Sequence, residues 1–181
     1  MIERAALWIS EGIKRQVPEH PSSVGVLKHA IAILLNILFI VAFTLLISIY
    51  TGHMKQATIG LIGFALLRQF SGGIHVKTGA GCIAITTTLF TAVSFVDLGE
   101  LPTQIINILS LLLVVLFAPS KIAKQSRIPR KHYPKLRLIS CIIVGVNFFI
   151  QSPTLSIVFF IQALSLIHLK GGETSVGNQQ I

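Results

Sequence analysis

The stretch of sequence that decides the fold class runs from His29 to Met54 and reads HAIAILLNILFIVAFTLLISIYTGHM. It contains no Asp, Glu, Lys or Arg. A helix of roughly 20 apolar residues crosses the hydrocarbon core of a bilayer, which is about 30 Å thick. The stretch therefore predicts a transmembrane helix.

The composition of the whole chain indicates the same fold class. Of its 181 residues, 52% are hydrophobic and only 12% are charged, and the mean hydropathy is +0.79. A soluble domain carries about 25% charged residues. The chain is therefore predicted to be an all-α, polytopic membrane protein.

Further apolar segments follow the first one along the chain. A turn at Gln151-Ser152-Pro153-Thr154 divides the last of them into two short pieces. Together they predict about six transmembrane or partly re-entrant helices. The further segments are Gln56–Leu67, Gly81–Val96, Thr103–Ala118 and Leu138–Leu169.

The N-terminal residues predict an amphipathic helix rather than a cleavable signal. Its apolar arc at helical spacing consists of Ile2, Ala5, Ala6, Ile9, Ile13 and Val17. Such a helix can lie in the membrane interface with Trp8 near the headgroups, or it can pack on the cytosolic face of the protein itself. The predicted organisation is a single membrane domain over 1–170, with the amphipathic helix at 1–17, a helical bundle at 29–169 and a disordered tail at 171–181.

The basic residues predict the orientation in the membrane. With a cytoplasmic N-terminus and six crossings, fourteen of the 15 Lys and Arg residues lie on the inner side and only Lys55 lies outside, which is a strong positive-inside bias. Seven of them form one basic segment. They are Lys121, Lys124, Arg127, Arg130, Lys131, Lys135 and Arg137.

Three roles for the basic segment are open. It can recruit an acidic substrate, it can bind anionic lipid headgroups, or it can serve only to fix the topology. A pI near 10.1 also raises the question of nucleic acid. We do not expect nucleic acid as a partner, because the charge is concentrated in one loop between apolar segments.

Residues 68–82 interrupt the apolar chain with a different kind of sequence, RQFSGGIHVKTGAGC. A potential base, His75, stands seven positions before a potential nucleophile, Cys82. In a regular helix the two would lie about 10 Å apart along the axis, too far for the hydrogen bond that activates a thiol. A joint site therefore requires the chain to fold back, and the pairs Gly72-Gly73 and Gly79-x-Gly81 permit such a path.

These residue types are the parts of a cysteine acyl-transfer site. Cys82 begins a predicted span, where the positive end of the helix dipole favours a thiolate. His75 can take up the thiol proton and return it to a leaving amine. Exposed amides around Gly72-Gly73 or Gly81-Cys82 could hold an oxyanion. No acidic residue lies in the motif to orient His75. The alternative is that Cys82 is a packing residue and His75 a solvated loop residue.

The pattern Arg68-x-x-x-Gly72-Gly73-x-His75-x6-Cys82 closely resembles the accessory gene regulator B (AgrB) family of bacterial quorum sensing. The later Ala118-Pro119, which precedes the basic segment, is similar to that family as well. The resemblance implies a membrane cysteine endopeptidase with His75 and Cys82 as its catalytic pair, supported by Arg68, Gly72 and Gly73.

The resemblance also implies a substrate and a location. A short propeptide would be cleaved on the cytoplasmic side of a bacterial cytoplasmic membrane through an acyl-enzyme thioester. A Cys or Ser of the propeptide would then close a thiolactone or lactone ring. The expected partners are the propeptide and membrane lipids. No cofactor is expected.

The remaining polar residues of the apolar segments are expected to bridge helices. They are Asn36, Gln104, Asn107, Asn147 and Gln162. Cys141 is expected to be inert packing. His132 and His168 have no partners at ligand spacing, so no metal site is expected. Gly60 and Gly63 indicate a close helix contact, and a homodimer through that contact is open.

Two other functions are compatible with the sequence. The first is a small transporter or peptide-export partner that binds an anionic ligand at the basic segment. Against it, the apolar segments contain no Asp, Glu, Lys or Arg, and His53 and His168 lie at their margins, whereas transport pathways commonly use intramembrane charge. The second is a lipid-binding scaffold built on the amphipathic helix and the basic segment.

Overall fold

The computed structural model describes residues 2–73, 79–120 and 129–167. Throughout this part of the chain the regular structure is helical, which confirms the predicted all-α class. A short 3-10 helix, η1 (Arg130–His132), precedes α7. The α-helices are α1 (Ile2–Gln16), α2 (Val24–Thr51), α3 (Met54–Ser71), α4 (Gly79–Ser94), α5 (Glu100–Phe117), α7 (Tyr133–Ile150) and α8 (Pro153–Leu164).

Three of the described helices, α2, α5 and α7, are long and apolar enough to cross a membrane. Two further apolar helices, α4 and α8, are shorter. The 12 residues of α8 extend only about 18 Å at 1.5 Å per residue, less than the hydrocarbon core of about 30 Å. The three long apolar helices make the chain a membrane protein. Because α8 is too short to cross the hydrocarbon core by itself, the six-crossing topology stays a prediction.

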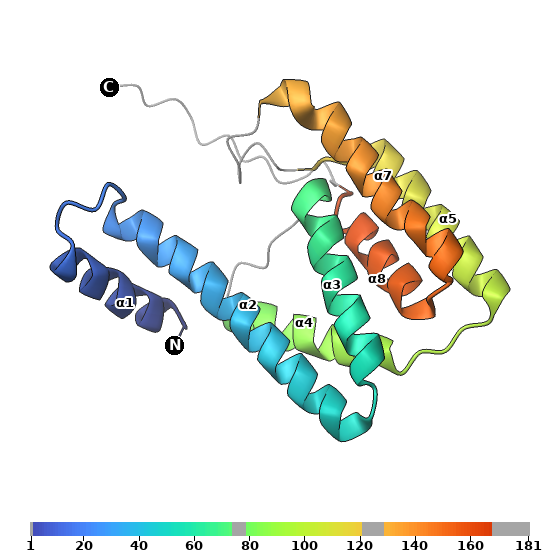
Figure 1. Cartoon of the computed structure of the whole chain (residues 1–181), viewed down its shortest axis with the longest axis horizontal. Helices are drawn as coiled ribbons and strands as arrows, with labels where there is room; N and C mark the ends of the chain where they lie inside the picture. The colour runs from blue at the N-terminus through green and yellow to red at the C-terminus, as the bar shows by residue number, and fades with distance from the viewer. Residues whose placement is uncertain (1, 74–78, 121–128, 168–181) are drawn as a thin grey trace.

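α8 forms the centre of one group of helices and is packed against α3, α5, α4 and α7. In Figure 1 it lies between α3 on one side and the pair α5 and α7 on the other. α2, with α1 alongside it, forms the other part of the molecule, and α3 contacts both parts. The short helix is enclosed by protein, whereas α2 presents most of its apolar surface outward.

The contact between α3 and α8 depends on two glycines of α3. A Cβ atom at Gly60 would lie 3.3 Å from Thr154 Cγ2, and one at Gly63 would overlap Leu155 and lie 3.3 Å from Phe159 Cε1. Leu155 and Phe159 belong to the buried core. The predicted close contact is therefore confirmed, and it is made within the chain.

We expect the substitution Gly63→Val to disrupt this contact, because the added side chain has no space between α3 and Leu155. Overpacking of this kind costs about 1–3 kcal/mol. The melting temperature in detergent, followed by the monodisperse fraction on size exclusion, should fall by several degrees, on the order of 5 °C. Gly145→Ala is the matched control, since nothing lies within 4 Å of its Cβ position. An unchanged melting temperature for Gly63→Val would show that α3 and α8 are not in contact as described.

Buried polar residues bridge the helices, as predicted for this class of side chain. Asn147 of α7 donates through Nδ2 to Ser156 Oγ of α8 (2.7 Å) and to Asn107 Oδ1 of α5 (3.4 Å). Its Oδ1 accepts from the backbone N–H of Ser152 at 3.1 Å. One amide thus joins three helices at the hairpin between α7 and α8.

The N-terminal helix has the predicted amphipathic character and packs along α2. Ala6 and Ser10 are buried in this contact, and Lys28 of α2 forms an ion pair with Glu3 at 2.9 Å. Trp8 is 77% exposed. The helix is therefore held by the protein itself while Trp8 faces outward, and its placement in the membrane interface stays a prediction. The predicted tail at 171–181 lies outside the described residues.

Candidate functional site

The ends of α3, α5 and α8 meet at the predicted motif, through backbone hydrogen bonds. Gly73 N–H donates to the carbonyl of Ser120 at 3.1 Å, and Ser120 N–H donates to the carbonyl of Ser71 at 2.9 Å. These bonds form an isolated parallel bridge between Gly72 and Ser120. The hydroxyl of Ser120 donates to the carbonyl of Leu166, just after α8, at 3.1 Å. Segments some 50 and 90 residues away in the chain thus hold the motif.

The two glycines of the motif are required by this geometry. Gly72 has φ 75° and Gly73 has φ 126°, values that L residues rarely adopt. A Cβ atom at Gly73 would also lie 2.6 Å from Ser165 Oγ and 3.3 Å from Gln162 Nε2. The chain leaves α3 through a turn that only glycine can make at this distance from α8.

The side chain of Gln162, on α8, is completely buried beside this turn. Its Nε2 donates to Ser71 Oγ at 3.0 Å and to the carbonyl of Gly72 at 2.6 Å. Its Oε1 accepts from Arg68 Nη1 at 3.3 Å. The amide therefore connects the C-terminal end of α3, the glycine turn and the motif arginine.

Arg68 lies in the last turn of α3 and is half-buried. Its guanidinium stands 5.6 Å from the centre of the Phe64 ring, within the range of a cation–π contact. It is also close enough to Cys82 for its charge to interact with a thiolate at that position. The structure thus places the charge of Arg68, on α3, within electrostatic range of Cys82, on α4.

Cys82 lies in the first turn of α4, as predicted, and is partly exposed. Its Sγ stands 3.9 Å from Thr86 Oγ1, one turn further along. The first four N–H groups of a helix have no partner within the helix, so they place positive potential around this sulfur. His75 lies outside the described residues, and its pairing with Cys82 stays a prediction.

The expectation that amides of Gly72-Gly73 hold an oxyanion is wrong for this pair. Gly72 N–H donates to the carbonyl of Arg68 at 3.0 Å, and Gly73 N–H donates to Ser120. Both donors are used by the turn itself. The other predicted source, the amides around Gly81 and Cys82 at the start of α4, stays a prediction.

The side chain of Asn36, on α2, lies next to Gly79 at the start of α4. A Cβ atom at Gly79 would lie 2.9 Å from Asn36 Oδ1, so a larger residue there would require the Asn36 side chain to move. In the described part of the chain this buried oxygen has no hydrogen-bond partner. The predicted bridging role is therefore not fulfilled by Asn36, although its neighbour Gly79 lies about one turn before Cys82 in α4.

The part of the basic segment that the structure describes lies at the start of α7. Lys131 and Lys135 are exposed. Arg137 Nε donates to the carbonyl of Ala118 at 2.6 Å, next to the cis peptide Ala118–Pro119. Lys121, Lys124 and Arg127 lie outside the described residues, as does the side chain of Arg130.

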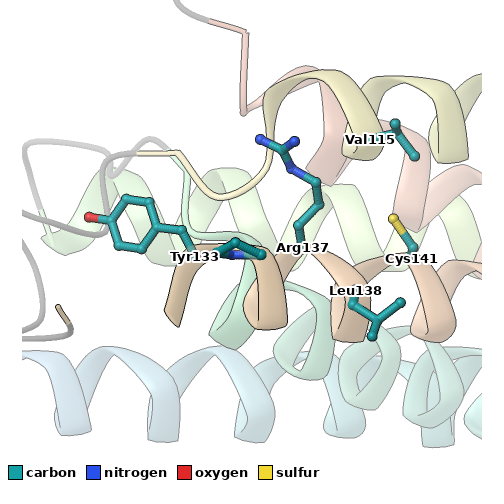
Figure 2. Close-up of a pocket in the computed structure, with 6 residues that line it drawn as sticks. Val115, Tyr133, Arg137, Leu138 and Cys141 are labelled. Atoms are coloured by element: carbon teal, nitrogen blue, oxygen red, sulfur yellow. The ribbon is translucent and has the colours of Figure 1, made fainter. Parts of the chain in front are cut away.

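A pocket of about 370 Å³ lies beside Arg137, between α5 and α7. Figure 2 shows the guanidinium directed toward the chain that follows α5, with Cys141 further along α7. The residues lining the pocket are Val115, Tyr133, Pro134, Arg137, Leu138 and Cys141. Neither Arg68 nor Cys82 lines it, so the pocket is separate from the candidate site.

Sequence reasoning missed three residues that hold the motif, namely Ser120, Gln162 and Ser165. Gln162 was assigned only a general bridging role, and the two serines were not singled out. The one available signal was an amide in the middle of a short apolar segment, which requires a buried partner.

No metal-binding group of three His, Cys, Asp or Glu residues occurs within 2–73, 79–120 and 129–167.

Comparison with known proteins identifies relatives of the chain. The profile of the family described as accessory gene regulator B matches residues 5–170. An AgrB-like protein of Halalkalibacterium halodurans is 28% identical over 100 residues, which are 55% of this chain and 51% of that protein. The matched part thus spans about half the length of this curated relative. No solved structure matches the chain.

Proposed function

The chain belongs to the accessory gene regulator B family, which implies a role in accessory-gene-regulator quorum sensing, and from this premise we propose that it is a cysteine endopeptidase. Its substrate is a short signalling propeptide, and its product is a cyclic peptide. The observation that carries the proposal is the position of Cys82, a partly exposed thiol in the first turn of α4, with the charge of Arg68 within electrostatic range of it. A permanent positive charge and a helix N-terminus beside a partly exposed thiol are what a nucleophilic cysteine requires.

In the first step Cys82 attacks the carbonyl of the scissile peptide bond. His75 accepts the thiol proton and donates it to the leaving nitrogen, as a general base and then a general acid. A thioester forms between Cys82 and the N-terminal part of the propeptide, the peptide bond breaks, and the C-terminal part leaves with a free amine. Arg68 and the first-turn amides of α4 stabilise the negative charge on sulfur and on the tetrahedral oxygen.

In the second step the ring closes. A Cys or Ser side chain of the bound propeptide attacks the thioester carbonyl, which transfers the acyl group and releases Cys82 as a thiol. The new bond is a thioester or an ester, so the product is a thiolactone or a lactone. Because thioester exchange conserves the activation of the acyl group, the step requires no ATP.

We place the reaction at the cytoplasmic surface of a bacterial cytoplasmic membrane. The support is the positive-inside distribution of the basic residues, which assigns Arg68, Cys82 and the basic segment to one side. The hydrogen bonds that join the ends of α3, α5 and α8 are consistent with this assignment, since those three ends lie together.

The basic segment recruits an acidic portion of the propeptide in this proposal. We expect Lys131→Gln combined with Lys135→Gln to raise KM for the propeptide about three- to tenfold with little change in kcat, because exposed charges contribute to encounter and not to the chemical step. The effect should diminish at high salt. Arg137 is not suited to this test, since its Nε is bonded to Ala118. A KM that does not change, together with weaker binding to anionic vesicles, would assign the two lysines to lipid instead.

The test of the proposed function is co-expression with small peptides encoded beside the gene, followed by mass spectrometry. The expected product is an N-terminal fragment lighter by one water than the linear cleavage product, as ring closure requires. Its absence when the chain carries Cys82→Ala would support the proposal. A propeptide that is exported uncut, or processed equally without Cys82, would instead favour the transporter or export-partner alternative.

A further inference from the structure

We propose that Gln162 is a positioning residue of the catalytic site, which fixes Arg68 and the Gly72-Gly73 turn relative to Cys82. The proposal rests on the proposed function, in which Arg68 stabilises negative charge at Cys82. It assigns to α8, the short central helix, a direct part in arranging a site that lies on α3 and α4.

The hydrogen bonds of Gln162 determine the orientation of its amide. Arg68 can only donate a hydrogen bond, and the carbonyl of Gly72 can only accept one. The amide oxygen must therefore face Arg68, at 3.3 Å from Nη1, and the amide nitrogen must face the carbonyl of Gly72, at 2.6 Å. Ser71 Oγ accepts the second N–H, and Ser165 Oγ lies 3.3 Å from the amide oxygen. Every donor and acceptor of the side chain is thus used by a residue at the site.

The burial of Gln162 makes these bonds strongly directing. The side chain has no exposed surface, and a buried polar group that loses its partner incurs the full cost of desolvation. The Ser165 hydroxyl donates to the main-chain carbonyl of Gln162 at 2.7 Å. Gln162 cannot rotate away without leaving Gly72 and Arg68 with one partner fewer.

Another buried amide of the same bundle, Asn147, bridges helices without contacting the motif. Asn147 joins α5, α7 and α8 at the hairpin before α8, and none of its partners is a residue of the motif. Gln162 instead has four side-chain contacts, three of them with consecutive parts of the 68–73 segment. The two buried amides therefore provide a matched pair, one expected to act on the site and one expected to act on stability alone.

Gln162 is expected to affect the reactivity of Cys82 by holding Arg68 in place. A guanidinium held by Gln162 and stacked near Phe64 keeps its charge in one place relative to Cys82. Replacing Gln162 by Leu removes that restraint. Replacing it by Glu places a negative charge against Arg68, which offsets the effect of the arginine on sulfur. Both changes should make Cys82 a poorer nucleophile toward any electrophile.

The test measures the alkylation of Cys82 without a propeptide. The chain has two cysteines, so Cys141→Ser provides a reference protein in which Cys82 alone reacts. The second-order rate constant with iodoacetamide is compared in this reference and after Gln162→Leu, Gln162→Glu or Asn147→Leu. Each protein is measured well below its own melting temperature. We expect both Gln162 variants to react about fivefold or more slowly, and Asn147→Leu to react within about twofold of the reference while melting at a lower temperature.

Cleavage kinetics supply the second readout. In both Gln162 variants kcat should fall while KM stays within about twofold, because the turn and Arg68 act on the chemical step. Alkylation at the reference rate in the Gln162 variants would overturn the proposal, and so would an equal slowing in Asn147→Leu. Should Gln162→Leu fail to fold, Gln162→Glu decides, since a carboxylate can still accept from Arg68.

The inference and the proposed function fail in distinguishable ways. If no propeptide is cleaved by the unaltered chain, the proposed function fails, whereas the alkylation rates still report on Gln162. If cleavage depends on Cys82 but neither the alkylation rate nor kcat responds to Gln162, the inference alone fails.

Discussion

Replacing Cys82 by Ala is expected to abolish propeptide cleavage, and replacing His75 by Ala is expected to reduce it by about 10³-fold or more. The first change removes the only atom that can form the acyl-enzyme, and the second removes the group that accepts its proton. The measurement is the rate at which the C-terminal fragment appears, in membranes or in detergent, quantified by mass spectrometry. In Cys82→Ala only background hydrolysis by water is expected.

The control for this prediction is Cys141→Ala. Cys141 lies on α7, in a pocket that neither Arg68 nor Cys82 lines, so its replacement should leave cleavage within about twofold. All three variants must be present in the membrane at similar amounts. Continued cleavage by Cys82→Ala or by His75→Ala would reject the dyad.

The second large effect is expected from a change of one methyl group, Gly73→Ala. The Cβ atom would lie 2.6 Å from Ser165 Oγ, at a φ of 126° that alanine avoids. The turn must shift to relieve both problems, and Arg68, which precedes it in α3, would move with it. Because a displacement of about 1 Å in a catalytic group can cost about 10²-fold, we expect kcat to fall by about that factor.

Two other glycines provide matched controls for the turn. Gly12 and Gly145 lie inside α1 and α7, and a Cβ atom at either position would meet nothing within 4 Å. Gly→Ala at such sites stabilises a helix by about 1 kcal/mol, so activity should be kept. Full activity of Gly73→Ala would contradict the described turn, whereas loss of activity in all three variants would indicate a general sensitivity to substitution.

The fold class could be predicted because the bilayer imposes it. A charge-free stretch such as 29–54 has no stable alternative to a helix in hydrocarbon, and α2 occupies almost the same residues. The division of 138–169 at Gln151 was also correct, since Gln151 has a left-handed backbone and Ser152 caps α8. The number of crossings was not predictable in the same way, because a 12-residue apolar segment such as α8 can be either a partial span or a buried core helix.

The site could be predicted only in its local part. The position of Cys82 at a helix start and the need for glycine at Gly72 and Gly73 both follow from short-range rules. The partners of these residues did not follow. Gln162 and Ser120 lie about 90 and 50 residues away from the turn, and nothing in the local sequence assigns them to it. For the same reason the use of the Gly72 and Gly73 amides by the fold was not foreseen.

The most direct test of the central claim is the detection of a covalent intermediate on Cys82. The purified protein is mixed with propeptide, quenched in acid within seconds, digested and examined by mass spectrometry. The account predicts that the peptide containing Cys82 gains the mass of the N-terminal part of the propeptide less one water. This adduct should be removed by hydroxylamine, as a thioester is, and should be absent from Cys82→Ala. Cleavage that proceeds in the unaltered protein without any adduct on Cys82, and equally in Cys82→Ala, would contradict the account.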